Sequence, residues 1–227
     1  MAVDPSDSVA ALPEPLPGDP FGLLVEWFTE AHRRRVQPNP DAMTLATVDP
    51  DGAPSARIVL CKAIDADLGR LTFYTNRSSR KGRAIEHEPR VALLMHWDTL
   101  DRQVRVEGVA SPTTDAESDA YFRTRRLESR LGAWASAQSE PIESRAALMS
   151  RVVEVMTRFG VTLDDFERGD ADIPKPPHWG GFHVLASAVE LWVSGPARMH
   201  DRARWVREIT AADGAPAGDW TATRLQP

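Results

Sequence analysis

Hydrophobic residues recur with two different spacings along the chain, and the first spacing is that of a helix. Leu24 and Trp27 belong to an apolar series at helical intervals that follows the pair Asp19-Pro20. This pattern predicts a helix with Asp19 as its N-cap and Pro20 at its first position. The cationic run 32–35 is expected to end the helix, because positive side chains suit the negative end of the helix dipole.

Farther along, apolar residues recur at every second position, which is the period of a strand with one buried face. We predict strands at residues 43–48, 55–63, 71–76, 91–97, 103–110, 181–185, 189–193, 203–208 and 220–225. Helical patterns cover residues 78–86, 114–126 and 142–159. The segment 161–177 is rich in Pro and Asp and is predicted to be a loop, and Asp213-Gly214 is a turn signal.

The order of these elements favours a mainly β (α+β) fold. The strands come in hairpin-like succession rather than as βαβ units, which favours an antiparallel barrel or roll with helices packed outside it. Residues 1–18 are rich in proline and lack Lys and Arg, so we expect an extended or disordered arm. Because no repeat or linker follows, residues 19–227 are predicted to form a single domain.

Composition then narrows the functional classes. The 227 residues carry 27 Lys and Arg against 33 Asp and Glu, a net charge of −6, which argues against a nucleic-acid partner. No apolar run approaches the roughly 20 residues that cross a bilayer, so no membrane partner is expected. Cys61 is the only cysteine, which excludes an intrachain disulfide. With no secretory signal recognised, we expect a cytoplasmic protein.

Several familiar catalytic patterns are missing from the sequence. It has no glycine-rich dinucleotide fingerprint after a strand and no phosphate-binding loop of the nucleotide-hydrolase type. It has no HExxH motif and no close group of histidines and carboxylates, so no metal site is expected. It also lacks the GxSxG motif of nucleophile-elbow hydrolases.

What remains is a set of cations placed where anions could bind. Ser78–Lys81 stands at a predicted helix start, where N–H groups, hydroxyls and two cations converge, although a capped surface helix would look the same. Tyr121, Arg125 and Ser129 are spaced i, i+4 and i+8, and they share one face if the helix continues that far. The alternative is a stripe of solvated side chains.

Two further segments carry cations on predicted strands. Arg198, His200 and Arg202 alternate, so on a strand they point the same way, either toward an anion or along a charged edge. Arg57 and Lys62 flank an apolar strand and would lie on opposite faces of it unless a bulge intervenes.

Taken together, these segments resemble the pyridoxine/pyridoxamine 5′-phosphate oxidase family from about Asp19 to the C-terminal residues. The motifs are AMTLATVDPDGAPSARIVLCK, FYTNRSSRKGR, RQVRVEG, YFRTRRLESRLGAWASAQS, PHWGGFHV, VELW and RMHDR. The resemblance implies an antiparallel FMN-binding split barrel that works as a homodimer, with FMN at the subunit interface. The long apolar strands 91–97 and 189–193 would offer surface for that interface.

The resemblance also implies a reaction. Hydride passes from C4′ of pyridoxine or pyridoxamine 5′-phosphate to flavin N5, and O2 reoxidises the flavin, which gives pyridoxal 5′-phosphate and H2O2. Two alternatives stay open: a relative that oxidises another compound, as in phenazine biosynthesis, and a non-catalytic protein that binds FMN or pyridoxal phosphate.

Residue roles carry over position by position. The implied FMN-binding residues are Arg57, Ile58, Val59, Leu60, Cys61, Lys62, Tyr74, Thr75, Arg80, Lys81, Gln103, Gln138, Ser139, Trp192 and Arg202. The implied substrate-binding residues are Lys62, Tyr121, Arg125, Ser129, Arg198 and His200, of which Arg198 and His200 are the implied catalytic residues.

Three segments depart from the family pattern. The N-terminal arm lacks the Arg-Arg-Glu-Tyr type segment that folds over the substrate. Asn39 stands where relatives often carry an acidic residue, and the segment 191–195 replaces a more usual Phe-Trp-Gln-Gly pattern. These departures concern substrate range and turnover more than FMN binding.

Overall fold

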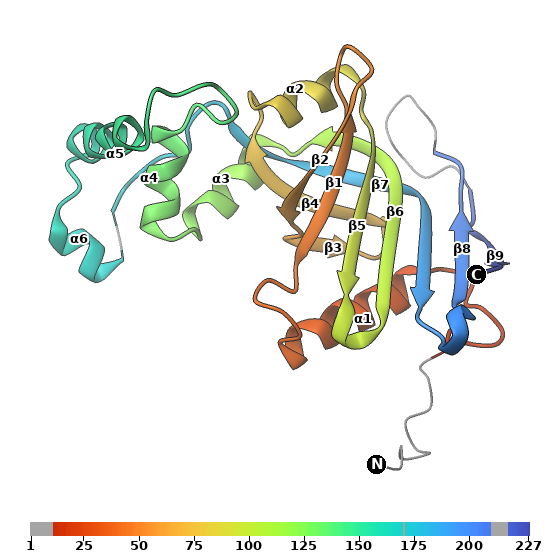
Figure 1. The fold of residues 1–227 in the computed structure, drawn as a ribbon. Coiled ribbons are helices and arrows are strands. Elements are labelled where there is room, and N and C mark those ends of the chain that lie inside the picture. The colour runs from red at the N-terminus through yellow and green to blue at the C-terminus, as the bar shows by residue number, and fades with distance from the viewer. Residues whose placement is uncertain (1–10, 170, 210–217) are drawn as a thin grey trace.

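The computed structural model describes residues 11–169, 171–209 and 218–227. Within these residues, nine strands form one antiparallel sheet with the order β2-β1-β5-β6-β7-β4-β3, and β8 pairs with β7 and β9. The strands are β1 (Ala42–Val48), β2 (Pro54–Leu60), β3 (Ala63–Asp65), β4 (Arg70–Asn76), β5 (Arg90–Trp97), β6 (Arg102–Pro112), β7 (Trp179–Val193), β8 (Asp201–Val206) and β9 (Thr221–Leu225). The curled sheet of Figure 1 confirms the predicted antiparallel split-barrel architecture.

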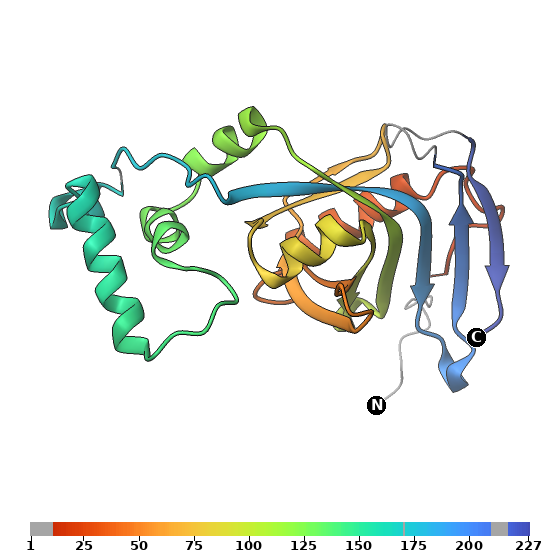
Figure 2. The same cartoon turned by 90° about the horizontal axis from the view of Figure 1, so that it is seen from above.

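Helices lie at both sides of this sheet. They are α1 (Phe21–Arg34), α2 (Arg80–His87), α3 (Asp115–Arg123), α4 (Leu127–Ala135), α5 (Arg145–Phe159) and α6 (Leu163–Arg168), with short 3₁₀ turns η1 (Asp98–Leu100) and η2 (Pro196–Arg198). Helix α1 inserts Leu24 and Trp27 into the barrel core beside Trp97. Helices α4–α6 project to one side as a separate lobe (Figures 1 and 2), with a small apolar core of their own that includes Leu131 and Val155.

Strand β7 organises the sheet because it pairs with three other strands. It pairs with β6 from Phe182 to Val193, with β4 from Trp179 to Leu185, and with β8 from Ala188 to Val193. The exchange of partner occurs at Ser187, where the register with β6 shifts and Ser187 Oγ donates a hydrogen bond to Glu107 O (3.1 Å). The two predicted strands 181–185 and 189–193 are therefore one continuous strand.

Several other predicted boundaries were wrong for local reasons. The predicted strand 55–63 ends at Leu60, because Cys61 and Lys62 break the pairing before β3. The predicted helix 114–126 ends at Arg123, and α4 and α6 arise where no helix was predicted. Helix α1 begins at Phe21, whose N–H donates to Asp19 Oδ1 (2.6 Å). The turn predicted at Asp213-Gly214 lies outside the described residues.

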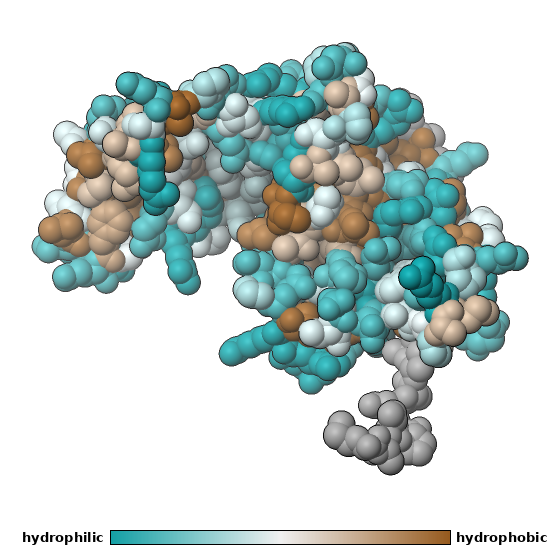
Figure 3. Space-filling model, viewed as in Figure 1, coloured by the Kyte–Doolittle hydropathy of each residue, from teal (hydrophilic) through white to brown (hydrophobic). Residues whose placement is uncertain are grey.

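The inward side chains of the long apolar strands are buried within one chain. Val91, Leu93 and Met95 of β5 and Val189 and Leu191 of β7 are all buried in the barrel core. The expectation that these strands supply interface surface therefore concerns only their outward side chains, and it stays a prediction. Apolar side chains that remain exposed include Ile58 on the barrel and Met149, Val153 and Leu163 on the helical lobe, and Figure 3 shows apolar patches over both parts.

The described part of the arm, residues 11–18, packs against the C-terminal strands. Leu12 is buried, and its N–H donates to Asp201 Oδ2 (2.8 Å). Trp205 Nε1 donates to Pro17 O (2.8 Å), and Arg224 Nη2 donates to Pro13 O (2.9 Å). These contacts hold the segment along β8 and β9.

Gly82 in the first turn of α2 is required by packing. A Cβ at this position would overlap the carbonyl group of Arg77. We predict that Gly82→Ala lowers the free energy of unfolding by about 2 kcal/mol or more, because the backbone that it meets cannot move aside cheaply. The control is Gly22→Ala in α1, where no atom lies near the added Cβ and Ala stabilises a helix by up to about 1 kcal/mol. Urea denaturation of both variants checks this, and equal stabilities would contradict it.

Candidate functional site

A cavity of about 960 Å³ lies where the barrel meets α3 and α4, near the upper end of the roughly 300–1,000 Å³ that small-molecule sites occupy. Its lining residues are Asn39, Ile58, Val59, Leu60, Lys62, Tyr74, Thr75, Asn76, Lys81, Tyr121, Arg125, Arg126, Ser129, Gly132, Ala133, Ser136, Gln138 and Trp179. No Asp, Glu or His is among them. The walls are therefore neutral or positively charged.

Lys81 is the most deeply placed cation of this cavity. Its ammonium group is buried at the start of α2, where it donates to Gln138 Oε1 (2.6 Å), Thr75 Oγ1 (3.1 Å) and Ser79 Oγ (3.1 Å). All three partners are neutral oxygens. Burial and the nearby positive charge of Arg57 lower the pKa of Lys81 to about 8. A buried ammonium group with no carboxylate partner is poised to bind an anion.

Arg57 and Arg80 extend this cationic group, which we call the deep cluster (Arg57, Arg80, Lys81). Arg57 donates to Thr47 Oγ1 (2.6 Å), Ser55 Oγ (2.7 Å) and Leu45 O (3.2 Å), again all neutral. Burial lowers the pKa of Arg57, and the charge of Arg80 adds to this effect. Arg80 donates through two nitrogens to Asp49 Oδ2, and this hydrogen bonding raises its pKa. Asp49 thus pairs with Arg80, whereas the hydrogen-bond partners of Arg57 and Lys81 are neutral oxygens.

A second group of polar side chains, the outer cluster (Lys62, Tyr121, Arg125, Ser129), lines the same cavity. The predicted continuous helix does not exist, since α3 ends at Arg123 and α4 begins at Leu127. The three predicted residues nevertheless face one cavity, because the break between the helices turns the chain around it. Arg125 Nη1 is buried without a hydrogen-bond partner, and burial lowers the pKa of this guanidinium. Lys62 Nζ is held by Asp41 Oδ2 at 2.6 Å.

Aromatic rings form one wall of the cavity. Tyr74 is stacked with Tyr121, with ring centroids 4.1 Å apart, and with Trp179, at 5.4 Å, and the rings of Tyr121 and Trp179 are themselves 6.2 Å apart. The guanidinium of Arg125 lies 4.9 Å from the centre of the Trp179 ring. Gly181 permits this packing, because a Cβ there would press on Tyr74. Such a wall supplies an apolar surface for a planar ligand and also orients Arg125.

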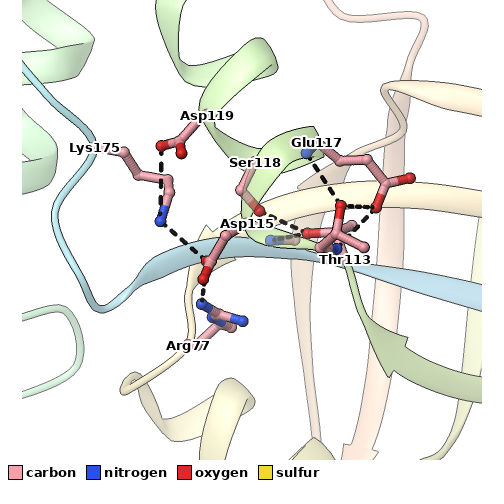
Figure 4. A network of polar contacts seen from close by, with 9 residues as sticks. Arg77, Thr113, Asp115, Glu117, Ser118, Asp119 and Lys175 are labelled. Atoms are coloured by element: carbon pink, nitrogen blue, oxygen red, sulfur yellow. Dashed lines mark hydrogen bonds and ion pairs between the residues drawn. The ribbon is translucent and has the colours of Figure 1, made fainter.

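Helix α3 is fixed to the barrel by a polar network (Figure 4). Thr113 Oγ1 accepts from Gly181 N (3.0 Å) and contacts Ser118 Oγ (2.7 Å). Asp115 pairs with Arg77 (3.5 Å) and with Lys175 (3.4 Å). The helix that carries Tyr121 is therefore tied to both β6 and β7 at its first turn.

A third group, which we call the distal cluster (Gln103, Trp192, Arg198, His200, Arg202), does not line the cavity. Gln103, Trp192 and Arg202 form one cross-strand row on β6, β7 and β8. The ring of His200 lies 4.7 Å from that of Trp192. Trp179 at the cavity and Trp192 in this cluster stand near opposite ends of β7 (Figure 2).

The expected strand face of Arg198, His200 and Arg202 was wrong. Only Arg202 belongs to β8, whereas Arg198 is the last residue of η2. Both Arg198 (φ 64°) and Ala197 before it (φ 55°) have a left-handed backbone. Gly195 makes this tight loop possible, because a Cβ there would overlap Met199 O. His200 Nδ1 accepts a hydrogen bond from Gly195 N (3.2 Å).

Four other predicted flavin residues do not line the cavity: Arg57, Cys61, Arg80 and Ser139. Cys61 is buried with its Sγ toward Ala63 O (3.5 Å), and burial raises the pKa of its thiol to about 12. Ser139 adopts a left-handed backbone (φ 77°) beside Gln138, which does line the cavity.

Several lining residues were not predicted to have a role. They are Asn76, Arg126, Gly132, Ala133, Ser136 and Trp179. Most of them belong to α4 or its ends, and the apolar spacing of Leu127, Leu131 and Ala135 is the signal that could have identified this helix. Within the described residues, no group of His, Cys, Asp or Glu is suited to hold a metal ion, and no helix is long and apolar enough to cross a membrane.

Family models match both parts of the chain that carry these clusters. Residues 28–159 match the model described as pyridoxamine 5′-phosphate oxidase, and residues 179–227 match the pyridoxine 5′-phosphate oxidase C-terminal dimerisation region. The chain belongs to the pyridoxine/pyridoxamine 5′-phosphate oxidase family. It is accordingly an oxidoreductase of that family.

Individual relatives agree with this assignment. The chain is 48% identical over 209 residues to the pyridoxine/pyridoxamine 5′-phosphate oxidase of Cupriavidus necator, covering 92% of this chain and 89% of that protein. The oxidase of Azorhizobium caulinodans is 47% identical over 210 residues, covering 92% of this chain and 90% of that protein.

Solved structures agree as well. PhzG from Burkholderia lata 383, in complex with tetrahydrophenazine-1-carboxylic acid, has a TM-score of 0.78 at 29% identity and covers 100% of this chain and 98% of its own. An FMN-binding protein from Nostoc punctiforme, related to pyridoxamine 5′-phosphate oxidase, has a TM-score of 0.66 at 16% identity, with both chains covered completely, which supports the fold.

The cavity fits the phosphorylated flavin that the family resemblance implies. The deep cluster offers Lys81, which has only neutral oxygen partners, and the N-terminal turn of α2 for a phosphate. Apolar residues of β2 and the aromatic wall provide contact surface for a planar ring system.

The pKa of Lys81 makes flavin affinity depend on pH. A phosphate dianion favours the charged amine, so FMN binding takes up a proton once the pH exceeds about 8. Affinity should therefore fall above that pH, by up to about tenfold per unit. Titration of the apoprotein by flavin fluorescence between pH 7 and pH 9 measures this effect.

Two controls isolate the contribution of Lys81. Riboflavin lacks the phosphate and should bind with little pH dependence, and Lys81→Gln should bind FMN weakly with a flat profile. A pH dependence of FMN affinity that persists in Lys81→Gln would contradict the assignment.

Proposed function

We propose that this protein is an FMN-dependent oxidase that converts pyridoxine and pyridoxamine 5′-phosphate to pyridoxal 5′-phosphate, with O2 as acceptor and H2O2 as by-product. The observation that carries the proposal is that one cavity has cations in two separate groups: Lys81 of the deep cluster, with Arg57 nearby, and Lys62 and Arg125 of the outer cluster. A site for FMN and a phosphorylated vitamin must hold two phosphates, and each phosphate needs its own charge-assisted hydrogen bonds.

The proposed division of work follows the two clusters. The deep cluster binds the FMN phosphate. Arg125, Ser129, Tyr121 and Lys62 hold the substrate phosphate, and the unpartnered Nη1 of Arg125 is the donor that such an anion would satisfy. When bound, FMN supplies the hydride acceptor and the reaction with O2. The cavity wall of one chain contains no carboxylate or imidazole, so its residues contribute positioning and positive charge to catalysis.

Assembly completes the site in this proposal. The distal cluster lies away from the cavity in the same chain, and four of its five residues fall in the segment that matches the dimerisation region. A second copy of the chain in a two-fold dimer would bring its distal cluster to the cavity of the first. There Arg202, Trp192 and Gln103 would contact the flavin, and Arg198 and His200 would hold the vitamin ring. Exposed Ile58, at the cavity wall, provides apolar surface for this contact.

The outer cluster also bears on the alternatives. The PhzG structure contains tetrahydrophenazine-1-carboxylic acid, and PhzG is 29% identical to this chain. The oxidase of Cupriavidus necator is 48% identical. The two cations and two hydroxyl groups of the outer cluster suit a phosphate dianion better than a singly charged carboxylate. We therefore favour the phosphorylated vitamin. A cytoplasmic location belongs to the proposal and is supported by the single buried thiol of Cys61.

The test is turnover of the FMN-loaded protein with O2. We predict that pyridoxine 5′-phosphate yields pyridoxal 5′-phosphate and H2O2, whereas pyridoxine without phosphate is turned over at least ~10²-fold less efficiently, because the positioning contacts of the outer cluster are lost. Bound FMN without any product would point to a binding protein. Equal efficiency with both compounds would contradict the role of the outer cluster.

Two distal variants separate substrate from flavin binding in the same assay. Arg198→Ala should lower kcat/KM by ~10²-fold or more while FMN stays bound. Arg202→Ala should weaken FMN retention first. Equal loss of FMN in both folded variants, or full turnover by Arg198→Ala, would contradict this division.

A further inference from the structure

Glu190, near the C-terminal end of β7, is a carboxylate that the proposed reaction does not use. It is only 3% exposed, although Glu is rarely buried unless it is paired. Its register partners are Arg105 on β6 and Arg204 on β8. It lies two residues before Trp192, so its side chain and that of Trp192 are on the same face of the sheet.

The contacts of Glu190 are directed at one distal residue. Its Oε1 accepts hydrogen bonds from Arg202 Nη2 (2.7 Å) and Arg202 Nε (3.1 Å). Its Oε2 lies 3.0 Å from Arg105 Nη2. The remaining nitrogen of Arg202, Nη1, donates to Gln226 O (3.1 Å). Every nitrogen of the Arg202 guanidinium is therefore held by the chain itself, and two of the three are held by Glu190.

These hydrogen bonds hold the Arg202 guanidinium in one position. Arg202 lies directly opposite Trp192, and Trp192 lies opposite Gln103, in the row that we assign to the flavin. The Glu190 carboxylate binds the Arg202 end of this row. An arginine side chain has several rotatable bonds, and a free one would have to be ordered when the ligand binds. Because the buried Glu190 carboxylate already orders the Arg202 side chain, ligand binding does not have to order it. The carboxylate also offsets part of the positive charge that Arg202 and Arg105 present.

A neighbouring ion pair shows what a purely structural link between the same strands looks like. Glu107 on β6 pairs with Arg204 on β8 at 2.7 Å and lies 3.3 Å from Arg105. It joins the same two strands across β7, but its recorded contacts do not include Arg202. Glu107, whose side chain is 40% exposed against 3% for Glu190, is therefore a control for cross-strand ion pairing but not for burial.

We propose that Glu190 is a positioning residue of the flavin site. It holds the guanidinium of Arg202 in its binding orientation and offsets part of its positive charge. The inference rests on the proposed role of Arg202 toward FMN. Glu190 itself does not touch the ligand; it acts through Arg202. Its loss should accordingly affect FMN affinity only while Arg202 is present.

A double-mutant cycle on FMN affinity tests this inference. Glu190→Gln keeps the shape of the side chain and removes its charge, and it should raise the Kd for FMN by about tenfold, the effect of losing a charge-assisted hydrogen bond. Arg202→Ala should raise the Kd at least as much. Adding Glu190→Gln to Arg202→Ala should then change the Kd by less than about twofold, because coupled residues are not additive. Glu107→Gln should leave the Kd within about twofold of the wild type.

The absorption spectrum of bound FMN gives a second readout. With the offsetting carboxylate gone, more positive charge acts on the flavin, so Glu190→Gln should shift the visible bands and make the flavin easier to reduce. If Glu190→Gln does not fold, Glu190→Gln combined with Arg105→Gln removes the buried charge imbalance and should show the same raised Kd.

The outcomes separate this inference from the proposed function. A wild-type protein that fails to bind FMN overturns both. If Arg202→Ala weakens FMN binding but Glu190→Gln does not, the proposed function stands and the positioning role is wrong. Additive effects of Glu190→Gln and Arg202→Ala would likewise show a general structural role and overturn the inference.

Discussion

The length of β7 constrains everything that this chain can do with a ligand. A strand rises about 3.3 Å per residue, so Trp179 and Trp192 are separated by roughly 40 Å along it. The bend visible in Figure 2 shortens the direct path but leaves the two ends on opposite sides of the barrel. One small molecule cannot contact both ends within a single chain. If both ends serve the same flavin, the site must be divided between two copies.

The buried positive charges beside the cavity favour the binding of anions there. Lys81 and Arg57 are placed close together with neutral partners, and burial lowers the pKa of both. The buried Nη1 of Arg125 has no partner. Each of these costs the folded protein free energy, since a buried cation loses its hydration. A phosphate at each cluster would recover that cost as binding energy. The distal cluster is different, because Arg202 already has its carboxylate in Glu190, and its preorganisation is complete before any ligand binds.

The sequence predicted the barrel well, because alternating apolar positions directly reflect one buried face. It failed where backbone geometry departs from regular periods. The Arg198 segment alternates like a strand, yet two left-handed residues and Gly195 turn it into a tight loop. Strand β7 was divided because small residues around Ser187 resemble a turn, whereas there they accommodate a change of pairing partner.

The same limits apply to the site. Tyr121, Arg125 and Ser129 of the outer cluster were predicted from helical spacing, and they do face one cavity, although α3 ends at Arg123. Arg80 and Lys81 of the deep cluster were predicted from their position at a helix start, and α2 supplies that start, with Ser79 as its N-cap. Arg57 was noted separately, at the end of an apolar strand. What no sequence pattern could provide is the separation of the distal cluster from the cavity. That separation follows from the pairing of β7 with β4 at one end and with β8 at the other.

Complementation between two damaged subunits tests the shared site most directly. Arg125→Ala damages the cavity side and Arg198→Ala damages the distal side, and each variant alone should be nearly inactive. If every site combines one cavity with the partner's distal cluster, mixed dimers regain one intact site, and an equal mixture recovers roughly a quarter of the wild-type activity. If both groups of residues come from the same chain, no mixed dimer has an intact site. Activity that stays at the level of the separate variants, in dimers shown to have exchanged subunits, would contradict the account.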